Sequence, residues 1–199
     1  MKLFLDRLGI ITIVVGILMP IPVLSHSLNR TEAIEHPHSR VLAQVDSYRY
    51  LVDAASKEAG LADRASDNFF AAFNQLPNAS EGRKLKLTNI LIQTSEQAAA
   101  HLQRCAELGL QSLPYWASVP STQIALDTIF RIQLEMARIF RSYNQLSIQA
   151  HSAIQTNDGA KARVLWTKFA MLEEKRTQLN QMTQQVHQAY KNLSNAENA

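Results

Sequence analysis

The stretch IFRIQLEMARIFRSYNQLSIQAHSA, residues 129–153, decides the fold of this chain. Its apolar residues recur at alternating intervals of three and four, the heptad spacing of a helix that packs along another helix. The positions are Ile129, Ile132, Met136, Ile139, Tyr143, Leu146, Ala150 and Ala153. This unbroken seam predicts a long amphipathic helix over residues 121–156.

A turn follows this helix. Asn157, Asp158 and Gly159 all favour turns, and an apolar pattern then resumes over residues 160–194. Its members are Ala162, Leu165, Phe169, Leu172, Leu179, Met182, Val186, Tyr190 and Leu193. Because a short connection forces two helices to lie antiparallel, the sequence predicts a long C-terminal helical hairpin.

Two further helical segments precede the hairpin. Residues 38–76 carry an apolar face that we expect to be broken near Gly60, since glycine favours a helix end. Residues 81–108 carry a second apolar face, and we expect Gly109 to end that helix.

We expect a loop over residues 110–120, while the other connections are short. No segment shows the alternation of a strand. The predicted fold is therefore all-α: an up-down-up-down four-helix bundle with a long antiparallel C-terminal hairpin.

An uncharged run near the N-terminus, LGIITIVVGILMPIPVL at residues 8–24, predicts export. Lys2 and Arg7 precede it and small polar residues follow, which is the layout of a signal peptide over residues 1–25. The run is short for the ~30 Å hydrocarbon core of a membrane. An uncleaved N-terminal anchor remains the alternative. The protein is expected to be extracytoplasmic, either periplasmic or secreted, or tethered to the membrane by residues 8–24.

The rest of the chain divides into three parts. We expect a flexible polar segment over residues 26–37, the helical bundle over 38–194 and a polar tail over 195–199. A second long apolar run is absent, so contact with a membrane is expected only where the N-terminal segment is retained.

The charge balance argues against nucleic acid as a partner. The formal net charge is only +3, whereas nucleic-acid-binding proteins carry clustered Lys and Arg in larger excess. The single cysteine, Cys105, rules out an internal disulfide. It falls on an apolar helix face, where a cysteine usually acts as a small hydrophobic residue.

The sequence assigns no catalytic, cofactor-binding or metal-binding residue. It contains no phosphate-binding loop, nucleophile elbow or His-Glu-x-x-His pair, so we expect no enzyme activity and no cofactor. Two alternatives stay open. A haem or metal could bind within the bundle through His101, His151, His187 and Met136, and copper could bind near the N-terminus through His26, His36 and His38.

Two large aromatic residues, Tyr115 and Trp116, fall in the predicted loop. Exposed Tyr and Trp side chains are effective interface anchors because they bring large area at low entropic cost. The alternative is that the loop folds over the end of the bundle as a cap.

Arg176 occupies a seam position where an apolar residue is expected, opposite the region of Phe140. Buried arginine needs a partner, and Glu173 and Glu135 are the carboxylates within reach. It either fixes the helix register or binds a partner, or its stem lies along the core while its head reaches water.

The last helix is rich in glutamine, and Gln181 and Gln185 lie beside its seam. Neutral hydrogen-bonding side chains at such positions suit contact between helices and also plain exposure. We therefore expect a non-catalytic, exported helical bundle that acts through protein–protein contact or self-association. It would serve as an adaptor, a chaperone-like partner or a structural component of a cell-envelope or secretion assembly. The alternative is a sensor or carrier that binds a ligand, haem or metal.

Overall fold

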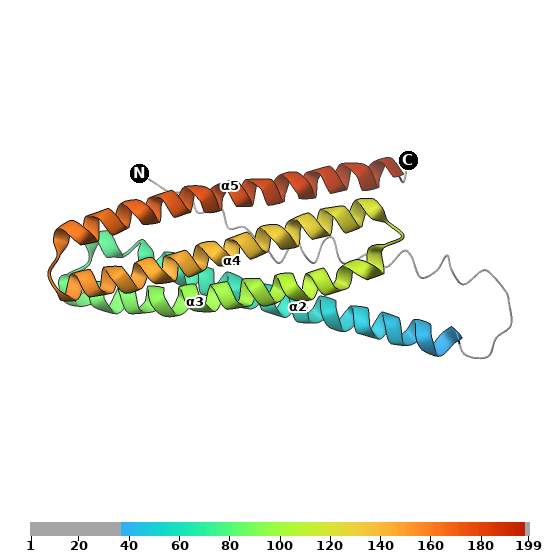
Figure 1. Ribbon diagram of the computed structural model, residues 1–199, viewed down its shortest axis with the longest axis horizontal. Helices are drawn as coiled ribbons and strands as arrows, with labels where there is room; N and C mark the ends of the chain where they lie inside the picture. Colours follow the sequence, from blue (N-terminus) through green and yellow to red (C-terminus); the bar gives the residue numbers. More distant parts are fainter. Residues whose placement is uncertain (1–36, 198–199) are drawn as a thin grey trace.

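The computed structural model describes residues 37–197, and it describes burial and side-chain contacts for residues 46–192. Within this range the chain forms four long helices: α2 (Pro37–Phe73), α3 (Glu81–Ser112), α4 (Pro120–Gln155) and α5 (Gly159–Glu197). Short 3₁₀ turns, η2 (Leu76–Asn78) and η3 (Leu113–Trp116), lie between them. The predicted all-α, up-down-up-down bundle is confirmed (Figure 1).

Two predictions fall partly or wholly outside this range. The proposed signal peptide over residues 1–25 and nearly all of the segment 26–37 lie outside the described residues. Within residues 37–197, none of the helices is both long and apolar enough to cross a membrane.

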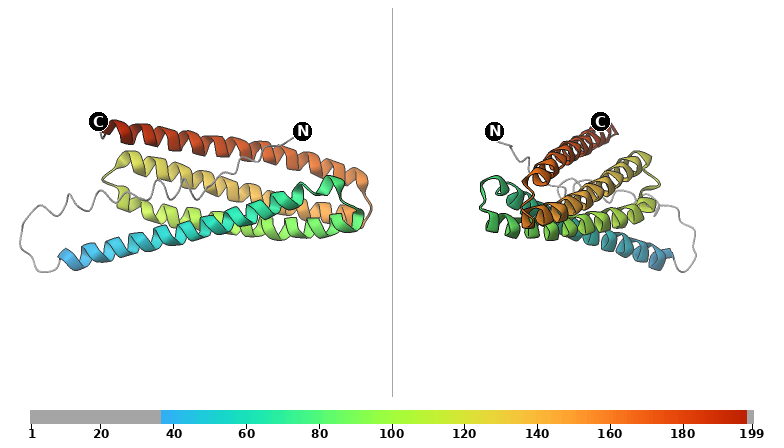
Figure 2. Two further views of the ribbon diagram at one scale, coloured as in Figure 1. Left: turned by 180° about the vertical axis from the view of Figure 1, so that it is seen from behind. Right: turned by 60° about the vertical axis from the view of Figure 1, so that its left-hand side comes forward.

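The α2–α3 and α4–α5 connections lie at one end of the bundle, and the α3–α4 connection lies at the other (Figure 1). We call these the hairpin end and the η3 end. Helix α3 packs between α2 and α4, and α5 packs along α4. Helices α2 and α5 meet near the hairpin end and diverge towards the η3 end (Figure 2).

The predicted seam of α4 is confirmed, because all eight residues that define it are buried. Beside it, aromatic rings of three helices form one cluster, with neighbouring ring centroids 4.9 to 6.2 Å apart. We call this the aromatic cluster; it consists of Phe69, Phe70 and Phe73 of α2, Phe140 and Tyr143 of α4, and Trp166 and Phe169 of α5. Such pairs contribute about 0.5–1.5 kcal/mol each beyond their buried area, so the cluster holds α2 against the hairpin.

The predicted antiparallel hairpin is also present, and its turn is tightly bonded. Asn157 adopts the left-handed conformation, with φ of 59°. The N–H groups of Asn157 and Asp158 donate to the carbonyls of Ile154 and Ala153 at 3.1 and 2.8 Å, which closes the end of α4. A carboxylate oxygen of Asp158 accepts from the N–H of Lys161 at 2.9 Å and caps the start of α5.

The expected break near Gly60 is wrong, because α2 runs unbroken from Pro37 to Phe73. Ala55, Ala59 and Ala62 are all buried and lie on one face that passes the glycine without a change of phase. Glycine within a helix costs about 1 kcal/mol relative to alanine. Packing along the whole face outweighs that cost.

The expected helix end at Gly109 is also wrong. Helix α3 continues to Ser112, and the region predicted as a loop contains η3 and the start of α4. Gly109 has no positive φ and is buried within the helix. It is a packing position, because its missing side chain leaves space for the ring of Phe130.

The predicted seam of α5 needs one correction. Met182 is exposed, and Asn180 takes an inward position instead. A straight helix of 3.6 residues per turn drifts away from a strict heptad, so the inward face shifts along so long a helix. Helix α5 also continues to Glu197, into the predicted polar tail.

Candidate functional site

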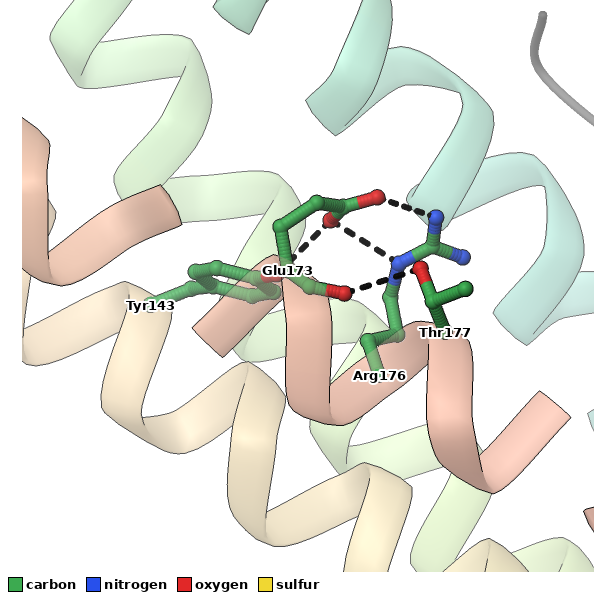
Figure 3. Close-up of polar contacts among 4 residues, drawn as sticks. All are labelled: Tyr143, Glu173, Arg176 and Thr177. Atoms are coloured by element: carbon green, nitrogen blue, oxygen red, sulfur yellow. Dashed lines mark hydrogen bonds and ion pairs between the residues drawn. The ribbon is translucent and has the colours of Figure 1, made fainter. Parts of the chain in front are cut away.

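Arg176 lies on α5 within a group of polar side chains that faces α4 and α2 (Figure 3). Its Nε and Nη2 atoms donate to the two carboxylate oxygens of Glu173 at 3.0 and 2.5 Å. The hydroxyl of Tyr143, on α4, donates to the same carboxylate at 2.9 Å. The hydroxyl of Thr177 donates to the backbone carbonyl of Glu173 at 3.0 Å. Glu173 therefore connects α5 to α4.

The Arg176 guanidinium also reaches α2. Its central carbon lies 4.5 Å from the centroid of the Phe70 ring, a cation–π contact. The centroids of the Phe70 and Phe140 rings lie 6.2 Å apart, so the ring that Arg176 contacts itself packs on Phe140, the residue expected opposite Arg176. Of the two carboxylates proposed as its partner, Glu173 is the one used.

Burial determines the electrostatics of this group. It raises the pKa of Tyr143 well above the usual value, and the charge of Glu173 raises that pKa further. Burial alone would lower the pKa of Arg176, but the bonds to Glu173 outweigh it and the net shift is upward. The Arg176 side chain is only 17% exposed. The group therefore ties three helices together and leaves little of its charge for an external partner.

The two aromatic residues of η3 have different environments. Trp116 is 4% exposed and Tyr115 is 38% exposed. Both pack on Tyr48 of α2, with centroid distances of 6.1 Å for Trp116 and 5.4 Å for Tyr115. Burial raises the pKa of Tyr48 to about 12. Trp116 thus belongs to a cap over the η3 end, and only Tyr115 presents substantial surface.

The outer face of α5, the side that points away from α4, is exposed to solvent. Gln181 and Gln185 are both exposed on it, as their sequence positions allow. Val164, Met171 and Met182 are exposed as well, by 58%, 67% and 47%. Sequence reasoning did not single out these three as surface residues. Their spacing of seven and eleven residues is the signal that could have placed them on one face.

The three helical histidines do not come together. Nδ1 of His101 donates to Glu58 at 2.6 Å, and Nδ1 of His151 lies 2.8 Å from the Thr88 hydroxyl. His187 lies on α5, where burial and then Lys191 lower its pKa. Among the described residues, no group of three or more His, Cys, Asp or Glu side chains is arranged to hold a metal ion.

Cys105 is fully buried, and burial raises its thiol pKa to about 12. Its environment is therefore that of a core residue. Of the three N-terminal histidines, His26 and His36 lie outside the described residues, and His38 lies in α2 but outside the range whose side chains are described. The copper site considered as an alternative therefore lies outside the described side chains.

Comparison of the chain with protein-family models, curated proteins and solved structures finds no match.

Proposed function

We propose that this chain is an exported, non-catalytic helical bundle that binds an amphipathic helix of another protein along the outer face of α5. The observation that carries the proposal is the uneven burial of that helix. Among the α5 side chains described, only Leu165, Phe169 and Asn180 are buried. A long helix that packs on one side and exposes apolar side chains on the other offers a surface for a second helix.

The exposed apolar side chains lie along one line. Val164 and Met171 are seven residues apart, and Met182 follows eleven residues later. Both intervals return a helix to nearly the same face. Methionine suits such a surface because its flexible, polarisable side chain adapts to a partner.

The charges on α5 indicate the chemistry of the partner. Within residues 159–192, Glu174 is its one exposed acid, whereas five basic residues are exposed: Lys161, Arg163, Lys168, Lys175 and Lys191. Complementary potentials steer association and select partners. The expected partner helix therefore carries acidic residues beside its apolar face, and a second copy of α5 would be repelled.

Gln181 and Gln185 fit the rim of this surface. Both are neutral and exposed close to Met182, and rims of interfaces are typically polar and hydrated. An adaptor, a chaperone-like protein or a structural part of an envelope assembly would each use such a surface.

The N-terminal sequence supports export. A basic start, an apolar run and a small polar exit together favour secretion across a membrane. Measurement of the intact mass of the protein from fractionated host cells tests this point. A mature chain in the extracytoplasmic fraction is expected, and an unprocessed chain confined to the cytosol would contradict it.

Photo-crosslinking tests the binding face. A photoreactive amino acid at Gln185 should yield a discrete adduct in the host, whereas one at Gln97, an exposed glutamine on α3, should not. Met171→Glu should abolish the Gln185 adduct, because it places acid against an acidic partner. Equal adducts from both positions would overturn the assignment of the face. An adduct of two copies of this chain would contradict the inference that the partner is a different, acidic helix.

A further inference from the structure

A cleft opens at the hairpin end of the bundle, between the α2–α3 and α4–α5 connections. Its volume is about 520 Å³, within the range of roughly 300–1,000 Å³ that is usual for small-molecule sites. Residues from the end of α2, η2, the start of α3 and both sides of the hairpin turn line it. The cleft is distinct from the outer face of α5 and from the group around Arg176.

The floor of the cleft is apolar and aromatic. Phe73 and Trp166 form part of it, and their rings meet edge to face at 6.1 Å. Leu76, Ala153 and Ile154 add aliphatic surface. Because Phe73 and Trp166 belong to the aromatic cluster, the floor is held in place by the core behind it. A surface of this kind accepts an alkyl chain or an aromatic ring.

The rim carries two acids that are already engaged. The carboxylate of Glu81 forms an ion pair with Lys84 at 2.7 Å. The carboxylate of Asp158 accepts the hydrogen bond from the N–H of Lys161 that caps α5. The charge of Glu81 is therefore balanced by Lys84, whereas Asp158 keeps its negative charge and is held in place at the start of α5 by a backbone N–H.

Arg163 is the cation of the rim that is free to meet a ligand. It lines the same cleft, and among the described residues it forms no ion pair. A guanidinium presents its N–H donors in a fork that matches carboxylate and phosphate oxygens. The cleft thus combines an apolar floor with one cation, Arg163, whose guanidinium forms no ion pair with the described part of the protein.

We propose that this cleft binds a single-chain amphiphile with an anionic headgroup, its chain on Phe73 and Trp166 and its head at Arg163. Laurate is a suitable probe, used as a monomer below the concentration at which it forms micelles. Lauryl alcohol has the chain without the charge, and acetate has the charge without the chain. We expect saturable binding of laurate at one site per chain, weaker binding of lauryl alcohol and none of acetate at the same concentrations.

The two tryptophans of the chain report the location. In the Trp116→Phe variant the remaining Trp166 lies in the cleft, and in the Trp166→Phe variant the remaining Trp116 is buried at the η3 end. Laurate should change the emission of Trp166 and leave that of Trp116 unchanged. Calorimetric titration of the unsubstituted chain gives the affinity independently of either substitution. Equal responses from both tryptophans, or a response that never saturates, would show non-specific binding and overturn the proposal.

Two charge variants test the role of Arg163. Arg163→Gln should weaken laurate binding by about tenfold, the loss expected for a hydrogen bond to a charged group. Lys168→Gln removes an exposed cation of the same helix that does not line the cleft, and should change affinity by less than about twofold. Equal effects of the two variants, or acetate binding as tightly as laurate, would refute the proposed recognition.

Discussion

A side chain on Gly109 would collide with Phe130, because a Cβ atom built there lies 2.2 Å from Cε1 of the ring. Phe130 is fully buried, and its ring fills the space beside the α3 backbone. Helices α3 and α4 therefore approach each other closely just before η3. The glycine that the sequence suggested as a helix end is required instead for packing within a helix.

We predict that Gly109→Ala destabilises the protein by about 1–3 kcal/mol, the usual cost of overpacking a core. The Phe130 ring or the backbone of α4 must move to accept the new methyl group. Helix propensity alone would favour alanine by about 1 kcal/mol, so the sign of the effect separates packing from propensity. Urea unfolding followed by circular dichroism measures it.

Gly82→Ala is the matched control, because a Cβ atom at Gly82 meets nothing within 4 Å. This variant should be as stable as the parent or slightly more so. Phe130→Leu removes the ring that the new methyl group would meet. In that background, Gly109→Ala should lower the free energy of unfolding by less than it does in the parent. Equal stability of the two glycine variants would contradict the packing role of Gly109.

Arg176→Met should destabilise the bundle by about 1–3 kcal/mol, since hydrogen bonds to charged groups contribute that much and Glu173 would lose its cationic partner. Arg138→Met, on α4, is the control. Arg138 also pairs with a glutamate three residues away, Glu135, but its side chain is 67% exposed. Exposed pairs contribute at most about 1 kcal/mol, so this variant should be nearly neutral. Thermal unfolding of both variants compares them, and equal shifts would show that Arg176 ties no helices together.

The heptad of α4 made the overall fold predictable. A spacing of three and four over residues 129–153 leaves one apolar face, and burial follows from it. The turn residues then fixed the register of α4 against α5, and the hydrogen bond from Tyr143 to Glu173 has the pairing that a turn centred on residue 158 gives. The packing of these helices could be predicted because it follows from a local pattern of residues.

Other features depended on neighbours that the sequence does not show. Gly60 and Gly109 looked like helix ends, and only the packing of adjacent helices reveals that the chain continues through them. The sequence allowed Trp116 to be either an interface anchor or part of a cap, and its contact with Tyr48 of α2 decides for the cap. The cleft joins residues 73–84 to residues 153–166, which are far apart in the sequence, and no spacing within one segment could have indicated it.

The hairpin turn allows a separate test of local bonding. Asp158→Ala removes the side-chain cap of α5 and should destabilise the protein by about 1 kcal/mol. Asn157→Gly should be neutral or stabilising, because glycine adopts the left-handed conformation without a steric penalty. Denaturant midpoints measured under identical conditions compare the two. A loss in the glycine variant as large as that in Asp158→Ala would contradict the bonding described for the turn.

The buried thiol of Cys105 makes the stability of the protein depend on pH in the alkaline range. Burial, followed by the charges of Glu58 and Asp63, raises its pKa to about 12, whereas a thiol in an unfolded chain has a pKa of about 8.5. Between these values the unfolded chain releases the thiol proton while the folded chain retains it. The stabilisation is complete below the unfolded pKa and is lost as the pH rises towards the folded one.

We therefore predict that the free energy of unfolding falls between about pH 9 and pH 11, with Cys105 contributing up to about 1.4 kcal/mol per pH unit. In Cys105→Ala this contribution disappears, so the decline should be shallower. The pKa of Tyr48 is also raised to about 12. Its titration therefore lowers the free energy of unfolding at alkaline pH in both proteins. Urea unfolding at a series of pH values measures the two curves. At neutral pH they should differ only by a constant, which reflects the lost packing of the sulfur atom. Curves that stay parallel up to pH 11 would show that the thiol titrates alike in the folded and unfolded chains, contrary to its complete burial between α2 and α4.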